Sequence, residues 1–159
     1  MKTVIPLLLL LVLHTSCKQA KYNLRQPEKN GKVIMSIERT PCFGTCATYS
    51  ATLYENGLLL YDGKRFTTKI GCYYTLIPKS ETGKVKAWFE EAGFWKMKEK
   101  YPEEDIVPTD LPTCSVFFNN GKQGKRVLDR GWETPTALTE LQNTIDAWID
   151  NRDLQPCYK

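Results

Sequence analysis

TYSATLYENGLLLYDG, residues 48–63, is the stretch that decides the fold class. Polar and apolar side chains alternate from Thr48 to Glu55, which is the period of a strand with one buried face. Asn56-Gly57 follows, and this pair favours a tight hairpin turn because both residues tolerate positive φ. Leu58 to Tyr61 then continues as the returning strand. The stretch therefore predicts an antiparallel β-hairpin.

The flanking segments extend this hairpin into a meander. Lys32 to Arg39 alternates in the same way and predicts a preceding strand. On the other side, Asp62-Gly63 has the composition of a second tight turn, and Arg65 to Ile70 is expected to form a fourth strand. Strands joined by such short turns pair with their neighbours, so we expect one antiparallel sheet.

The second half of the chain predicts two helices and one further hairpin. Helical spacing of apolar side chains is found in residues 78–92 and 134–151. Residues 113–118 and 124–128 are expected to form strands around the Asn-Asn-Gly turn at 119–121. Helices and strands that do not alternate indicate an α+β fold. We therefore expect an antiparallel β-sheet, a meander plus a second hairpin, with two amphipathic helices packed on one face.

The first residues have the pattern of a secretory signal. A basic start at Lys2 precedes an apolar run over residues 4–13, which is too short to span a bilayer. Thr15-Ser16-Cys17 resembles the lipobox of bacterial lipoproteins, in which the cysteine is acylated and becomes the new N-terminus. His14 departs from that pattern, because an apolar residue is usual at its position. We expect a signal peptide over residues 1–16 and lipidation of Cys17.

This start divides the chain into three parts. Residues 17–31 are expected to form a lipidated cysteine followed by a flexible tether, because they are polar and lack apolar periodicity. Residues 32–159 suffice for a single α+β domain. The expected location is the bacterial cell envelope, where the N-terminal lipid anchors a monomer to a membrane at its periplasmic or surface face.

Charge and composition exclude several classes of function. The chain has 22 basic and 18 acidic residues without a long basic run, so we expect no nucleic-acid partner. Its one histidine is His14, which is lost with the signal peptide. This excludes catalytic triads and imidazole zinc sites from the mature chain. No glycine-rich phosphate loop is present either, and we expect no cofactor, no metal and no enzymatic activity.

Five cysteines remain besides Cys17, and export places them in a disulfide-permissive compartment. The candidates for disulfides are Cys42, Cys46, Cys72 and Cys114, and Cys157 in the polar tail is expected to be the unpaired one. The sequence does not give the pairing. An alternative is a thiol-based redox or metal site at Cys42/Cys46, although redox motifs have two residues between the cysteines and this pair has three.

Around this pair the sequence resembles a known family. The run Pro41-Cys42-Phe43-Gly44-Thr45-Cys46 is similar to the signature of an uncharacterised domain common in lipoproteins of Bacteroidetes-type bacteria. Further matches are Tyr49, Asn56-Gly57, Tyr61-Asp62-Gly63 and Thr109-Asp110, and the likeness covers about residues 33–150. Ala47 stands where the signature has proline. The resemblance implies a lipoprotein domain, and no activity is assigned to that family.

Three residues are candidates for ligand contact: Trp132, Tyr73 and Asp110. Trp132 lies in a Gly-Trp-Glu loop where its ring could stack on a sugar. Our leading hypothesis is a non-enzymatic binding or interaction module of the cell envelope, whose partner is an envelope protein or a glycan. The second alternative, a carboxylate-based hydrolase, would use the acidic loop of residues 103–110, since paired carboxylates can hydrolyse glycosidic bonds.

Overall fold

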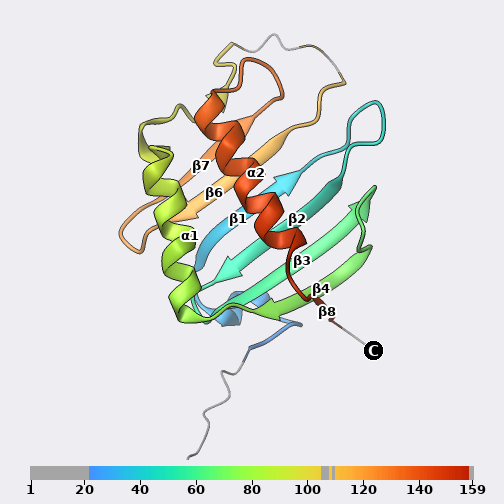
Figure 1. The fold of residues 1–159 in the computed structure, drawn as a ribbon, viewed down its shortest axis with the longest axis vertical. Coiled ribbons are helices and arrows are strands. Elements are labelled where there is room, and N and C mark those ends of the chain that lie inside the picture. The colour runs from blue at the N-terminus through green and yellow to red at the C-terminus, as the bar shows by residue number, and fades with distance from the viewer. Residues whose placement is uncertain (1–21, 105–107, 109, 158–159) are drawn as a thin grey trace, which may run out of the picture.

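The computed structural model describes residues 22–104, 108 and 110–157. The expected signal peptide and Cys17 lie outside these residues. In the described part the chain forms an eight-stranded, mostly antiparallel sheet in the order β5-β7-β6-β1-β2-β3-β4-β8 (Figure 1). The α+β architecture predicted from the sequence is confirmed. Among the described helices, none combines the length and the apolar character needed to cross a membrane.

The predicted meander forms the centre of the sheet. It consists of β1 (Val33–Arg39), β2 (Thr48–Tyr54), β3 (Leu58–Arg65) and β4 (Gly71–Leu76), each antiparallel to the next. The Asn-Gly turn is confirmed, and Gly57 has φ 87°. A side chain at Gly57 would also lie 2.5 Å from the carbonyl oxygen of Ile77, so glycine is needed there for space as well.

The second tight turn was placed wrongly by the sequence. Asp62 and Gly63 lie inside β3, the turn is formed by residues 66–70, and the fourth strand begins at Gly71. A Cβ on Gly63 would lie 1.8 Å from the carbonyl oxygen of Lys69. Glycine at position 63 therefore leaves room for the 66–70 turn, which folds back over the strand. Close approach of another backbone segment is a common reason for glycine within a strand.

The second hairpin extends the sheet on the far side of β1. It consists of β6 (Cys114–Asn119), which pairs with β1, and β7 (Gly124–Asp129), and the short β5 (Lys100–Tyr101) lies parallel to β7. The prediction of this hairpin from the Asn-Asn-Gly turn is confirmed.

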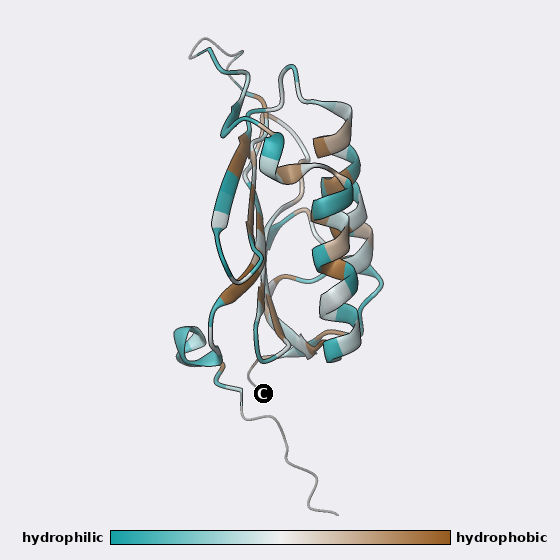
Figure 2. Cartoon of the chain, turned by 90° about the vertical axis from the view of Figure 1, so that its left-hand side faces the viewer, coloured by the Kyte–Doolittle hydropathy of each residue, from teal (hydrophilic) through white to brown (hydrophobic). Residues whose placement is uncertain are grey.

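Both α-helices cover the same face of the sheet, as predicted (Figure 2). They are α1 (Lys79–Glu91) and α2 (Thr136–Asp150), and a short 3-10 helix, η2 (Phe94–Lys96), follows α1. The core lies between the two layers, where the largest fully buried side chains are Phe89, Phe94 and Phe118. The hydroxyl of Thr134, just before α2, donates to Asp129.

The described part of the predicted tether, residues 22–31, has defined structure and packs on the domain. Residues 22–31 include the 3-10 helix η1 (Pro27–Asn30), and Asn30 is buried. The side chain of Asn30 bonds the backbone of Asn23 and accepts from Asn56 Nδ2 at 2.9 Å. These amide contacts dock the segment on the β2–β3 turn. The periodicity of the sequence does not predict such contacts.

The C-terminal segment corrects the expected cysteine assignment. After α2 the chain returns to the sheet, where β8 (Gln155–Pro156) pairs with β4 and the Cys157 amide donates to the Cys72 carbonyl at 3.0 Å. Cys157 forms a disulfide with Cys72, and Cys42 forms one with Cys46. Among the cysteines of the described residues, the unpaired one is Cys114, which lies across the sheet from Arg39 and Asp129.

Candidate functional site

A row of polar side chains crosses the helix-facing side of the sheet. Arg39 on β1 lies opposite Tyr49 on β2 and Cys114 on β6, and Cys114 lies opposite Asp129 on β7. The adjacent inward positions carry the buried apolar residues Ile37, Ala51, Val116 and Val127. The row therefore forms one boundary of the hydrophobic core.

Helix α2 supplies the partners of this row. Gln142 Nε2 donates to Asp129 Oδ2 at 2.9 Å. One turn later, Asp146 accepts a hydrogen bond from Arg39 Nη2 at 2.5 Å and another from the Tyr49 hydroxyl. Residues four apart on a helix lie on the same face, so both polar contacts fall on the buried side of α2. They fix the helix over the sheet at a defined position.

Burial raises the pKa of the Cys114 thiol to about 12, although the neighbouring Arg39 opposes this shift. Since the thiolate is the reactive form, we expect alkylation of Cys114 at pH 8 to be on the order of a thousand-fold slower in the folded than in the unfolded chain. The measurement is mass spectrometry of a Cys17→Ser chain treated with iodoacetamide. One label, on Cys114 and only after denaturation, is expected, whereas labelling of the native protein would contradict the buried assignment.

Tyr49 also keeps its proton in the fold. Burial, followed by the charge of Asp146, raises the pKa of Tyr49 above the usual value of about 10. Above pH ~10 the unfolded chain loses this proton while the folded chain holds it. The contribution to stability is therefore complete below that pH and is lost as pH rises. We expect the free energy of unfolding, measured with denaturant from pH 9 to 11, to fall less steeply in Tyr49→Phe. An equal slope of the free energy of unfolding against pH in the wild type and in Tyr49→Phe would contradict this.

A cavity of about 470 Å³ opens beside the Arg39–Asp146 pair. This volume lies in the range of small-molecule sites, roughly 300–1,000 Å³. Its lining comes from the polar row, from the 66–70 turn, from the chain around Cys46 and from the last two turns of α2. The lining residues include Arg39, Tyr61, Phe66, Asn143, Asp146 and Asp150. The cavity combines aromatic faces with hydrogen-bonding groups.

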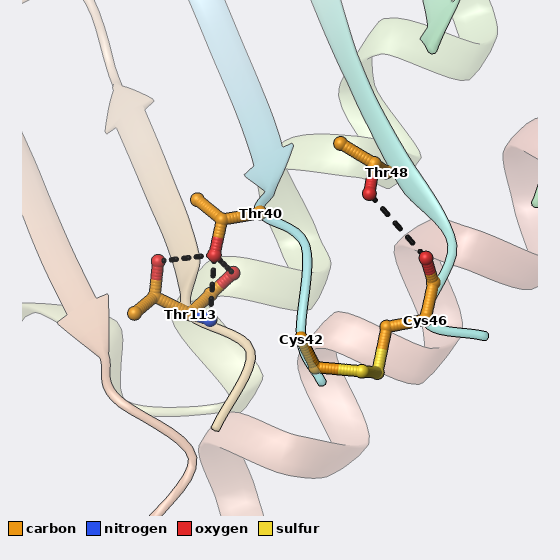
Figure 3. Close-up of a disulfide and its surroundings, with 5 residues drawn as sticks. All are labelled: Thr40, Cys42, Cys46, Thr48 and Thr113. Atoms are coloured by element: carbon orange, nitrogen blue, oxygen red, sulfur yellow. Dashed lines mark hydrogen bonds between the residues drawn. A yellow bond between two sulfur atoms is a disulfide. The ribbon is translucent and has the colours of Figure 1, made fainter. Parts of the chain in front are cut away.

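The Cys42–Cys46 disulfide closes the loop between β1 and β2 beside this cavity (Figure 3). Before the loop, the Thr40 hydroxyl lies 3.0 Å from the Thr113 hydroxyl, and after it Thr48 Oγ1 donates to the Cys46 carbonyl at 3.3 Å. Cys46 itself lines the cavity. The covalent link holds the loop in shape, which gives this pair a structural role next to the site.

The three residues predicted to contact a ligand lie on different segments of the chain. Trp132 is 49% exposed and borders a separate hollow with Pro102. Tyr73 is half-buried on β4 against the core. Asp110 is exposed, and its carbonyl oxygen accepts from the Phe43 amide at 3.4 Å. None of the three lines the cavity beside Arg39.

The acidic loop does not form a recessed pair of carboxylates in its described part. Glu103, Glu104 and Asp110 are exposed, and Glu103 lies 3.4 Å from Lys98 in a solvent-exposed ion pair. Asp105 lies outside the described residues. Within the described ranges no three acidic, cysteine or histidine side chains gather in a way that could hold a metal ion.

Sequence reasoning missed Arg39, Asp146 and Phe66. Arg39 was visible as the charged end of an alternating strand, and Asp146 as a carboxylate between Ile145 and the apolar Trp148-Ile149. A charge on an inward face indicates a partner on the facing element, because unpaired buried charges are costly. Phe66 carried no signal, since its segment was assigned to a strand.

Comparison with known proteins gives one result about the family. A family model described as "Domain of unknown function (DUF6438)" matches residues 33–149. No curated protein matches the chain.

Proposed function

Given that the chain belongs to the DUF6438 family of domains of unknown function, we propose from its site that it is a non-enzymatic ligand-binding module. The observation that carries the proposal is the cavity of about 470 Å³ beside the Arg39–Asp146 pair. A concave site that combines aromatic walls with a few polar groups is the usual form of a small-molecule site.

Two features favour binding over catalysis. Asp146 already accepts hydrogen bonds from Arg39 and Tyr49, so it is held as a structural acceptor. A general acid or base has to be within hydrogen-bond reach of the substrate, whereas both carboxylate oxygens of Asp146 already have partners within the protein. The sequence has no histidine after His14 that could take that role.

The proposal places the module in the bacterial cell envelope as a lipoprotein. Its support is the sequence of residues 1–17 and two disulfides, which are typical of exported proteins. The test is the intact mass of the protein isolated from its native membrane. A chain that starts at Cys17 and carries a lipid increment is expected, and a chain that starts elsewhere without lipid would refute the anchoring.

Ligand binding is tested by NMR with the isotope-labelled chain and the small-molecule fraction of an envelope extract. We expect shifts of the amide signals of Asn143 and its cavity neighbours. Asn143→Trp should abolish these shifts, because residue 143 is exposed on α2 and lines the cavity, so that the larger ring fills it. Ala147→Trp is the matched control, one turn later on α2 and outside the cavity. An extract that leaves the cavity signals unchanged would refute the proposal.

A further inference from the structure

Phe66 is unfavourable for the stability of the ligand-free protein in two ways. Its φ of 54° lies in the left-handed region, which is unfavourable for a residue with a bulky side chain. Its ring is also 50% exposed to solvent. Glycine or asparagine would suit the backbone better at this position of the turn. Packing in the free fold therefore does not explain why an aromatic residue stands there.

The turn holds this ring at the cavity. Thr67 Oγ1 donates to the Lys69 carbonyl at 2.9 Å, and the turn lies directly over Gly63. Phe66 lines the cavity together with Tyr61. Strain of this kind is concentrated at binding sites, where it is tolerated because it places a side chain for a ligand. An exposed aromatic face at a cavity wall is suited to a ring-shaped ligand.

Charges of both signs lie at the cavity. Arg39 is paired with Asp146, Asp150 also lines the cavity, and Arg65 lies beside the lining residue Phe66. The guanidinium of Arg65 lies 5.0 Å from the centre of the Phe66 ring. A cationic ligand would compete with Arg65 for that ring, and an anionic ligand would face two carboxylates. Since both a cation and an anion meet an unfavourable neighbour, a neutral ligand fits the cavity best.

The polar lining offers both donors and acceptors. Asn143 supplies a donor and an acceptor, Thr68 supplies a hydroxyl, and Asp150 supplies a carboxylate. Hydroxyl groups of a ligand can satisfy both kinds because each donates and accepts. A purely apolar ligand would leave these groups without partners, which is unfavourable.

We infer that this cavity binds a neutral saccharide, with one ring face against Phe66 and its hydroxyl groups hydrogen-bonded to Asn143 and Asp150. The C–H groups on one face of a pyranose ring are weakly positive and contact the negative face of an aromatic ring. The inference rests on the proposed function and narrows it to one chemical class of ligand.

The test uses NMR titration of the full chain, both disulfides intact, with three saccharides: methyl β-glucopyranoside, methyl β-galactopyranoside and N-acetylglucosamine. Benzyltrimethylammonium is titrated as a cationic aromatic comparison. At least one saccharide is expected to shift the cavity signals at millimolar concentration. Phe66→Asn should weaken that binding at least ten-fold while the melting temperature stays equal or rises. Phe66→Leu, which keeps an apolar side chain without a π face, should weaken it to a similar extent.

Trp132→Asn is the matched control, because Trp132 is an equally exposed aromatic residue outside the cavity. It should leave the affinity unchanged. Saccharide binding that survives both Phe66 variants would overturn the inference. The inference would also be overturned if benzyltrimethylammonium shifted the cavity signals and none of the saccharides did. In that case the cavity would still be a ligand site, and the proposed function would stand.

Discussion

Replacing Cys72 and Cys157 together by serine is expected to lower the free energy of unfolding by about 4 kcal/mol. The two cysteines are 85 residues apart, and a crosslink over such a span removes about 4.5 kcal/mol of chain entropy from the unfolded state. Measured losses for native disulfides are about 2–5 kcal/mol. Denaturant unfolding measures the loss, and the melting temperature should fall by about 15 °C for a domain of this size.

The Cys42→Ser, Cys46→Ser double variant is the matched control. It removes the same kind of bond, but over a separation of only four residues, for which the same entropy relation gives about 2 kcal/mol. The first variant should therefore be the less stable by about 2 kcal/mol. Equal losses would show that loop length does not govern the stability of this fold, and the contribution of the long crosslink would then have to come from local contacts of β8.

The fold was predictable from the sequence where signals were local. The Asn56-Gly57 turn, the alternation on either side of it and the helical spacing of residues 134–151 all depend on neighbouring residues. Asp62-Gly63 has nearly the same composition as the true turn, yet it lies within β3. Its glycine serves the close approach of Lys69, which is a tertiary contact. Composition alone does not distinguish the two uses of glycine.

The candidate site was less predictable because distant segments form it. Arg39 and Asp146 are 107 residues apart in sequence, and only the packing of α2 on β1 brings them together. The pairing of Cys72 with Cys157 likewise depends on the return of the chain after α2. Trp132 was selected for its loop composition and is exposed, but it does not line the cavity. Loop composition does not report which distant segments lie next to a residue.

Asp146→Asn is expected to destabilise the domain by about 2–3 kcal/mol. The change removes the charge that balances Arg39, whose side chain is only 23% exposed. Breaking a fully buried ion pair costs about 3–5 kcal/mol, and the partial exposure of both partners reduces that figure. Arg39 Nε is buried and lacks a hydrogen-bond partner in the described part of the chain, so the guanidinium relies on Asp146. Denaturant unfolding measures the loss.

Asp150→Asn is the control for the substitution itself. Asp150 is exposed, lies on the same helix and lines the same cavity, so that its loss should change stability by less than about 0.5 kcal/mol. A double-mutant cycle with Arg39→Met separates the pair from its surroundings. When both charges are absent, no buried charge is left unpaired. The double variant should therefore lose at least about 1 kcal/mol less free energy of unfolding than the two single variants lose together. Strict additivity would mean that Arg39 and Asp146 do not act as a pair. The position of α2 over the cavity would then depend on the Tyr49–Asp146 and Gln142–Asp129 hydrogen bonds and on the apolar contacts.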